Sequence, residues 1–224
     1  ITMNIFALHE DPKISAEMMI DKHVIKMPTE SCQMLHTNAM YFLYVEQYDT
    51  VPTLAELKAF HRKLGLNLMK PAMLNHPSTI WARETKGNWN WLMEHAIALC
   101  DEYTLRYDRE HGSESRIMET PKYPHPDDTS AITPVTIAMD DAYRLNEKDY
   151  YNCNPNASGW DFVIASYRHY YLEGKWRIAE WRNDRRPNWF PSNQFAKKHN
   201  KWVRAYNLSN PSKYPQIQIS EELQ

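Results

Sequence analysis

Glycine is scarce in this chain of 224 residues, which contains only five. They stand at positions 65, 87, 112, 159 and 174, so no two are close enough to form a phosphate-binding loop. Dinucleotide-binding fingerprints and P-loops both need closely spaced glycines. The sequence therefore excludes both kinds of nucleotide site.

Cysteine is also rare. Cys32, Cys100 and Cys153 are widely spaced and include no C-x-x-C pair, and the N-terminus lacks the charged-then-apolar layout of a secretory signal. These absences predict a reducing, cytoplasmic environment. The mean hydropathy of −0.71 argues against insertion into a membrane. The high content of aromatic residues argues against disorder.

Aromatic residues are abundant, with 8 Trp and 14 Tyr, and they recur mostly at helical spacing. The pattern predicts an all-α fold, an irregular bundle of six to nine helices, with one short strand at Met3–Leu8 as an option. We expect a single domain over residues 1–224. A loop rich in Pro, Asp, Ser and Thr at 119–134 is predicted to be flexible, and an extended tail is predicted from residue 211.

Capping signals set the expected helix boundaries. Asp11 followed by Pro12 predicts a helix start, and the helical pattern from Ile14 to Val45 is expected to break or kink at Pro28. Thr53 opens a capping box. Further helices are expected from that box to Gly65, from His76-Pro77 to Glu84, at about 86–111 and 157–173, in a short piece up to Trp181, and at about 192–207.

Charge is distributed unevenly. The net charge is −2, but residues 168–204 hold ten basic and three acidic side chains, a local charge of +7 that leaves −9 for the rest. Eight Trp, Tyr and Phe rings are interleaved with those charges. Such a mixture can neutralise phosphates and stack on bases, so DNA is the expected partner. The alternative is a solvated helix face whose rings turn into the core.

The side chains predicted to bind DNA are Arg168, Lys175, Arg182, Arg185, Arg186, Lys197, Lys198, Lys201 and Arg204.

A polar stripe marks the first long helix. At 100° per residue, His23, Lys26, Glu30, Gln33 and Thr37 fall within an arc of about 80°. A base, a cation, an acid and an amide on one strip are what an enzyme needs to bind a polar substrate and move its protons. The apolar residues Val24, Ile25, Cys32 and Leu35 point elsewhere and are expected in the core. The alternative is an ordinary solvent-facing stripe held by i,i+4 pairs.

Several residues beyond the stripe complete the predicted site. Asp21 is a reserve carboxylate. His76, Trp81 and Arg83 are expected to form an opposite wall, although a histidine before proline is also typical of a helix cap. Tyr167 is a further substrate-binding candidate, from the run Tyr167-Arg168-His169-Tyr170-Tyr171. A zinc site built from His23, Glu30, His36 or His76 fits no standard ligand spacing, so neither metal nor cofactor is expected.

The run from Met3 to Phe6, with Asp21-Lys22-His23-Val24-Ile25-Lys26-Met27 and Glu30-Ser31-Cys32-Gln33, resembles bacteriophage-type pyrimidine-dimer DNA glycosylases of the endonuclease V type. The likeness continues in Asn75-His76-Pro77 and Ile80-Trp81-Ala82-Arg83-Glu84, and in scattered blocks up to Lys175. The resemblance implies a DNA-acting enzyme of a bacterium or a phage-infected cell, with Glu30 as the counterpart of the family's glutamate. It also extends to the helical enzymes of DNA base hypermodification.

The sequence therefore predicts an N-glycosylase that flips a damaged or modified pyrimidine out of the helix. Glu30 would stabilise the positive charge on the deoxyribose or activate the attacking nucleophile. His23 would donate a proton to the leaving base, and Gln33 would hydrogen-bond to that base. Lys26 would hold a flanking phosphate or attack the sugar as an amine. The alternatives are an amino-acid:DNA transferase or similar hypermodification enzyme, and a non-catalytic DNA-binding protein. The oligomeric state stays open.

Overall fold

The computed structural model describes residues 3–126 and 130–211, which form nine α-helices, two short 3-10 helices and no strand. This confirms the all-α class. The helices are α1 (Pro12–Glu17), α2 (Asp21–Tyr48), α3 (Leu54–Leu64), α4 (Pro77–Glu84), α5 (Lys86–Tyr107), α6 (Glu114–Met118), α7 (Glu147–Cys153), α8 (Gly159–Gly174), η1 (Trp176–Ile178), η2 (Arg182–Asp184) and α9 (Gln194–Ser209).

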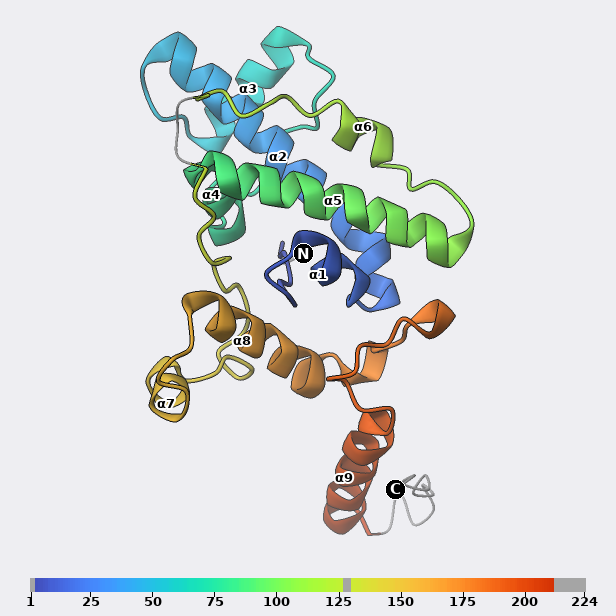
Figure 1. Cartoon of the computed structure of the whole chain (residues 1–224). Helices are drawn as coiled ribbons and strands as arrows, with labels where there is room; N and C mark the ends of the chain where they lie inside the picture. The colour runs from blue at the N-terminus through green and yellow to red at the C-terminus, as the bar shows by residue number, and fades with distance from the viewer. Residues whose placement is uncertain (1–2, 127–129, 212–224) are drawn as a thin grey trace.

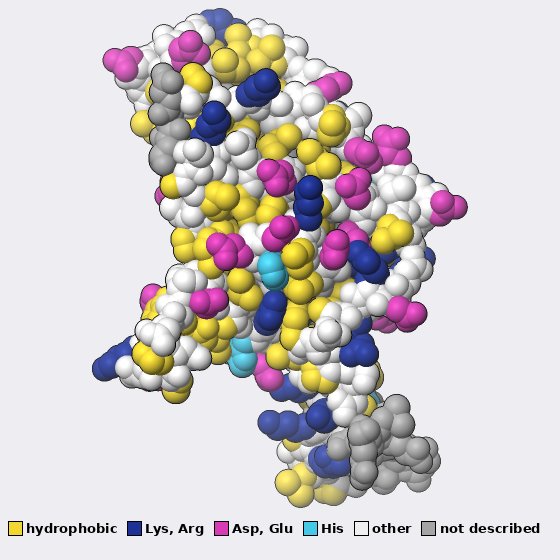
Figure 2. All heavy atoms as spheres, in the orientation of Figure 1, with side chains coloured by type: hydrophobic (Ala, Val, Ile, Leu, Met, Phe, Trp, Pro, Cys, Tyr) yellow, Lys and Arg dark blue, Asp and Glu magenta, His cyan; other side chains and the backbone are white. Residues whose placement is uncertain are grey.

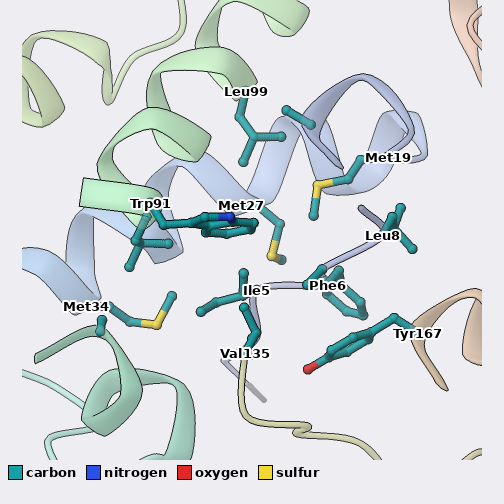
Figure 3. Packing of buried hydrophobic residues seen from close by; sticks show 14 of the residues in the cluster. Ile5, Phe6, Leu8, Met19, Met27, Met34, Trp91, Leu99, Val135 and Tyr167 are labelled. Carbon is teal, nitrogen blue, oxygen red and sulfur yellow. The ribbon is translucent and has the colours of Figure 1, made fainter. Parts of the chain in front are cut away.

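The two longest helices, α2 and α5, pack along each other and lie in the upper half of the molecule in Figure 1, together with α3, α4 and α6. The N-terminal segment and α1 lie between this pair and α8, and α9 projects away from the body below. The N-terminal segment is the centre of the core. Ile5 and Phe6 are at most 5% exposed and lie among Met27, Trp91 and Tyr167 (Figure 3).

The strand suggested for Met3–Leu8 does not form. Side chains take the place of a partner strand: Asn4 Oδ1 accepts the backbone N–H groups of Ile5 and Phe6, and Ser15 Oγ accepts that of Leu8. Arg168 Nε donates to the Leu8 carbonyl. Because these buried backbone groups are already paired, the segment is stable as extended coil.

The capping signals are confirmed. Asp11 caps α1, Thr53 makes the capping box of α3, and Gly65 ends α3 with a φ of 60°. The helix does not break at Pro28, because α2 continues through that residue, and a kink there stays a prediction. The chain breaks instead at residues 18–20, where Arg106 donates to the carbonyls of Glu17 and Met19 and satisfies the end of α1.

Later boundaries differ by a few residues from those expected. Helix α5 ends at Tyr107 rather than residue 111, because Asp108 adopts the left-handed conformation. Helices α8 and α9 each begin and end within two residues of the expected positions, and the piece before Trp181 is the 3-10 helix η1. The sequence did not predict α6 and α7.

The segment 119–134 is held to the bundle on both sides of residues 127–129, which lie outside the described residues. Tyr123 is buried and donates to the Arg83 carbonyl, and Thr133 exchanges hydrogen bonds with Asn88. The flexibility of this loop and the single-domain organisation stay predictions. The predicted tail from 211 lies outside the described residues after its first residue.

Gly87 in the first turn of α5 allows this loop to approach. A Cβ at position 87 would lie 2.4 Å from the carbonyl oxygens of both Ser130 and Ala131. We therefore expect Gly87→Ala to lower the free energy of unfolding in urea by about 1–3 kcal/mol, the usual cost of overpacking, despite the better helix propensity of alanine. Gly112→Ala is the matched control, because nothing lies within 4 Å of a Cβ there. Equal stability of the two variants would contradict this account.

Candidate active site

The polar stripe of α2 runs through the interior of the protein. His23 is 5% exposed, Glu30 8% and Thr37 0%, whereas the Lys26 side chain is about half exposed. Ile25, expected in the core, is 45% exposed. The solvent-facing alternative is therefore wrong, although the i,i+4 pairing that it assumed does occur between Lys26 and Glu30.

Glu30 is held from two sides. Its Oε1 lies 2.8 Å from Lys26 Nζ, and its Oε2 accepts the backbone N–H of Asn4 at 3.2 Å. The Asn4 side chain joins two further segments, because its Nδ2 donates to the Ala138 carbonyl at 2.5 Å and its Oδ1 accepts the Tyr167 hydroxyl at 2.9 Å. The carboxylate is thus fixed by the N-terminal segment, which α8 fixes in turn.

A cavity of about 680 Å³ opens beside this pair. His23, Lys26 and His76 line one side of it, and Tyr143, Tyr170 and Lys175 line the other. The structure therefore brings together three predicted site residues from α2 and the start of α4. It adds a wall from the segment before α7 and from the end of α8.

Phe6 forms an aromatic stack in this cavity. Its backbone has a φ of 56°, in the left-handed region, and its ring lies 4.0 Å from the His23 ring at an interplanar angle of 22°. Tyr170 stacks on Phe6 at 6.1 Å and on Tyr143 at 5.1 Å. Lys175 Nζ lies 4.9 Å from the centroid of Tyr170. Strained backbone of this kind is characteristic of functional sites.

Both histidines of the cavity are neutral rings at neutral pH. Burial, with smaller effects of Lys175 and Lys26, lowers the pKa of His23 to about 3. Burial also lowers the pKa of His76, although the nearby Glu30 opposes this shift. His76 serves as the N-cap of α4 through its Nδ1, so it is both the helix cap that was considered and a cavity residue.

A second cavity, of about 560 Å³, lies on the other side of the ion pair. Its walls are mainly apolar and include Met3 and Met73, with Glu30 and Gln33 at the polar edge. Gln33 Nε2 donates to the Lys70 carbonyl at 2.7 Å. Because Lys26 lines both cavities, the Lys26–Glu30 pair separates them.

Other predicted site residues lie elsewhere. Asp21 does not line either cavity, because its Oδ1 accepts from the fully buried guanidinium of Arg106 at 3.0 Å and from the backbone N–H of Arg182. Trp81 is 1% exposed and donates to the Thr133 carbonyl. Arg83 donates to Asn38 and to the Leu74 carbonyl. Neither side chain lines a cavity with His76.

Tyr167 is also fully buried, and burial raises its pKa far above the usual range. Its hydroxyl therefore stays protonated and donates to Asn4. This contact places Tyr167 behind the site.

Eight of the nine predicted DNA-binding residues divide into three groups, and the ninth, Arg182, lies in η2. Lys175 lies in the first cavity, and Arg168, Arg185 and Arg186 line a separate groove of about 600 Å³ beside Trp189. A third group, Lys197, Lys198, Lys201 and Arg204, lies on α9. On the face seen in Figure 2, Lys and Arg side chains gather over the lower part of the molecule and Asp and Glu mostly over the upper part.

Some of these cations already have carboxylate partners. Arg185 pairs with Glu102 and, at 3.7 Å, with Glu17. Arg182 Nε lies 3.8 Å from Asp21, and Lys198 pairs with Glu173. Arg168 is half-buried, and its described contacts are the Leu8 carbonyl, the Met18 sulfur and the Trp189 ring. Burial lowers its pKa.

Sequence reasoning missed Asn4, Phe6, Tyr143 and Asp140 as site residues. Only the first two had a signal, as part of the run Met3–Phe6 that carries the resemblance. In the described ranges, no three His, Cys, Asp or Glu side chains are grouped to hold a metal. No described helix has the length and apolar character needed to cross a bilayer.

Residues 3–115 match the model of a family described as pyrimidine dimer DNA glycosylase. No curated protein and no solved structure matches the chain. The matched residues include α2 with Lys26 and Glu30, whereas the wall formed by Tyr143, Tyr170 and Lys175 lies beyond them. Since the match spans half of the chain and contains the whole Asn4–Lys26–Glu30 arrangement, this protein belongs to the pyrimidine dimer DNA glycosylase family.

Proposed function

We propose that this protein is a DNA N-glycosylase that takes a damaged or modified pyrimidine out of the duplex and breaks its bond to the deoxyribose. The observation that carries this proposal is the Lys26–Glu30 pair, whose lysine lines a cavity together with aromatic rings and hydrogen-bond donors. The family to which the chain belongs supports the same chemistry.

The first cavity suits a flipped nucleotide. Its volume of about 680 Å³ lies within the usual range of small-molecule sites. Flipping a base costs a few kcal/mol, least for a damaged base. Stacking on exposed parts of Tyr143 or Tyr170 and hydrogen bonds to the base edge would offset this cost.

Glu30 acts on the sugar. Cleavage of the N-glycosidic bond builds positive charge on the deoxyribose, and a fixed carboxylate stabilises that charge most strongly where water is excluded. Glu30 is 8% exposed, its Oε2 accepts the Asn4 N–H, and its buried Oε1 faces the Lys26 ammonium without accepting a hydrogen bond from any described residue, so this oxygen is left to interact with the developing charge. It could also take a proton from an attacking water.

His23 acts on the leaving base. A ring with a pKa of about 3 carries no positive charge at neutral pH, so His23 stabilises the departing base by a hydrogen bond from a neutral imidazole. Lys26 and Lys175 add positive charge at the cavity. Gln33, at the polar edge of the second cavity, lies one helical turn beyond Glu30 and would bind the same lesion from the other side.

Lys26 has two chemically distinct roles open to it. As an ammonium paired with Glu30 it binds a flanking phosphate, and water then attacks the sugar to leave an intact abasic site. As a free amine it would attack C1′, the base would leave with the bonding electrons, and the amine proton would pass to Glu30. The second route ends in a Schiff base. The ion pair favours the first route, because an ammonium has no lone pair.

We expect Glu30→Gln to lower base release at least about 100-fold, because it removes the negative charge beside the sugar and keeps the acceptor for Asn4. The assay uses duplexes that carry a cyclobutane pyrimidine dimer or a modified pyrimidine. DNA affinity should change less than about threefold. Glu46→Gln, an exposed change on the same helix, is the control. Near-normal release by Glu30→Gln on every substrate would reject this site and favour the transferase or the binding protein.

We expect no covalent complex when wild-type protein, lesion DNA and borohydride are mixed, because Lys26 serves as a phosphate contact. Lys26→Ala should raise KM for DNA about tenfold, and Lys26→Arg should restore most of the loss, since either cation binds phosphate. A borohydride-trapped adduct that disappears in both variants would show instead that the Lys26 amine attacks.

We expect the triple change of Lys197, Lys198 and Lys201 to Ala to weaken DNA binding about tenfold or more, because α9 carries no acidic side chain. The slope of log affinity against log salt should fall by about two to three. A matched triple change of Lys58, Arg62 and Lys63 on α3 should leave both quantities unchanged. Equal behaviour of the two triple variants would show that α9 does not contact DNA.

A further inference from the structure

The two histidines of the first cavity each have Nδ1 occupied by a group of the protein itself. His23 Nδ1 lies 2.7 Å from the Tyr171 hydroxyl, and His76 Nδ1 lies 3.2 Å from the backbone nitrogen of Ser78. A neutral histidine has one donor and one acceptor nitrogen, so these contacts decide what each ring offers through Nε2.

His76 is the simpler of the two. A backbone N–H can only donate, so the N–H of Ser78 requires Nδ1 of His76 to be an acceptor. The proton of the neutral ring then lies on Nε2. His76 therefore offers the cavity a hydrogen-bond donor.

Tyr171 fixes the state of His23. This tyrosine is fully buried, and burial keeps its pKa far above the usual range, so the hydroxyl stays protonated. Among the described residues, His23 Nδ1 is the hydrogen-bond partner of this hydroxyl, and donation of the hydroxyl proton to it places the proton of the His23 ring on Nε2. Its stack on Phe6 at 4.0 Å holds the orientation.

Two acceptors in the lining of the cavity are already engaged. Asn4 Oδ1 accepts the Tyr167 hydroxyl and two backbone N–H groups, and the Ala138 carbonyl accepts from Asn4 Nδ2. Lys26 and Lys175 can only donate. One oxygen of Asp140 accepts the N–H of Ala142, and this residue is exposed at the mouth of the cavity. The buried part of the cavity is therefore rich in donors.

We propose that this cavity selects pyrimidines with carbonyl oxygens at both positions 2 and 4, the thymine and uracil type, over cytosine-type bases with an amino group at position 4. The inference rests on the proposed function and specifies its substrate class. Thymine presents O4 as an acceptor where cytosine presents N4–H₂ as a donor. An amino group that faces the Nε2–H of His23 or His76 places two donors against each other, and both stay unpaired. A site built from buried donors discriminates strongly against such a base.

The experiment compares two duplexes that differ only in one base, thymine or 5-methylcytosine, placed opposite an abasic site so that neither base is paired. Binding is measured by competition with Glu30→Gln protein, which retains the cavity and does not release the base. We expect thymine DNA to bind roughly tenfold more tightly than 5-methylcytosine DNA. Equal affinities would overturn the inference.

Two variants test the cause of the preference. Tyr171→Phe, in the same background, removes the hydroxyl that fixes His23 and should reduce the preference to about threefold or less. His76→Leu removes the second donor and should also reduce it, which keeps the test valid if Tyr171→Phe does not fold. Tyr103→Phe, which alters a buried tyrosine of α5 away from the cavity, should retain the preference. An unchanged preference in folded Tyr171→Phe and His76→Leu would overturn the inference.

Failure of the proposed function gives a different result. If wild-type protein releases no base from any lesion while the Glu30→Gln preference for thymine persists, glycosylase chemistry is rejected and the inference about base selection stands. If base release occurs but the two duplexes bind equally, the function stands and the inference is rejected.

Discussion

The side chain and backbone of Asn4 form the hydrogen bonds on which the rest of the site depends. They connect the N-terminal segment to Glu30 of α2, to Tyr167 of α8 and to the carbonyl of Ala138. The same amide oxygen accepts the N–H of Phe6, whose φ of 56° turns its ring onto His23. A buried polar group left unpaired costs about 1–3 kcal/mol, so losing Asn4 would free several such groups at once. The position of the carboxylate and that of the aromatic stack are therefore coupled.

A second buried network explains why nearby polar residues of α2 have different roles. Arg106 is fully buried and pairs with Asp21 and Glu102, and it also donates to the carbonyls that end α1. Removing one member of a buried ion pair leaves an uncompensated charge, which typically costs 3–5 kcal/mol. Asp21 thus stabilises the junction of α1, α2 and α5. Glu30, held by a half-exposed lysine and one backbone N–H, lines the second cavity, and its partner Lys26 lines both cavities.

Local signals in the sequence predicted much of the fold. Asp11-Pro12, the Thr53 box and Gly65 act through neighbouring residues, so their effect is visible without the tertiary structure. Periodicity placed His23, Lys26 and Glu30 on one strip, but it cannot tell an interior strip from an exposed one. The break at residues 18–20 depends on Arg106, which is 86 residues beyond Ile20, and the burial of Trp81 depends on the loop at Thr133. The walls at Tyr143 and Tyr170 come from distant segments for the same reason.

The first cavity combines two parts of the chain with different relations to the family. Residues 3–115, which match the family, supply Lys26 and both histidines to this cavity, and they supply Glu30 as the partner of Lys26. Residues beyond the match supply Tyr143, Tyr170 and Lys175, whose rings and charge face the same space. Tyr167 and Tyr171 also lie beyond the match, yet they fix Asn4 and the proton position on His23. The C-terminal half therefore contributes to the site in two ways. It forms part of the cavity wall, and its hydrogen bonds determine which atoms of the matched half can donate.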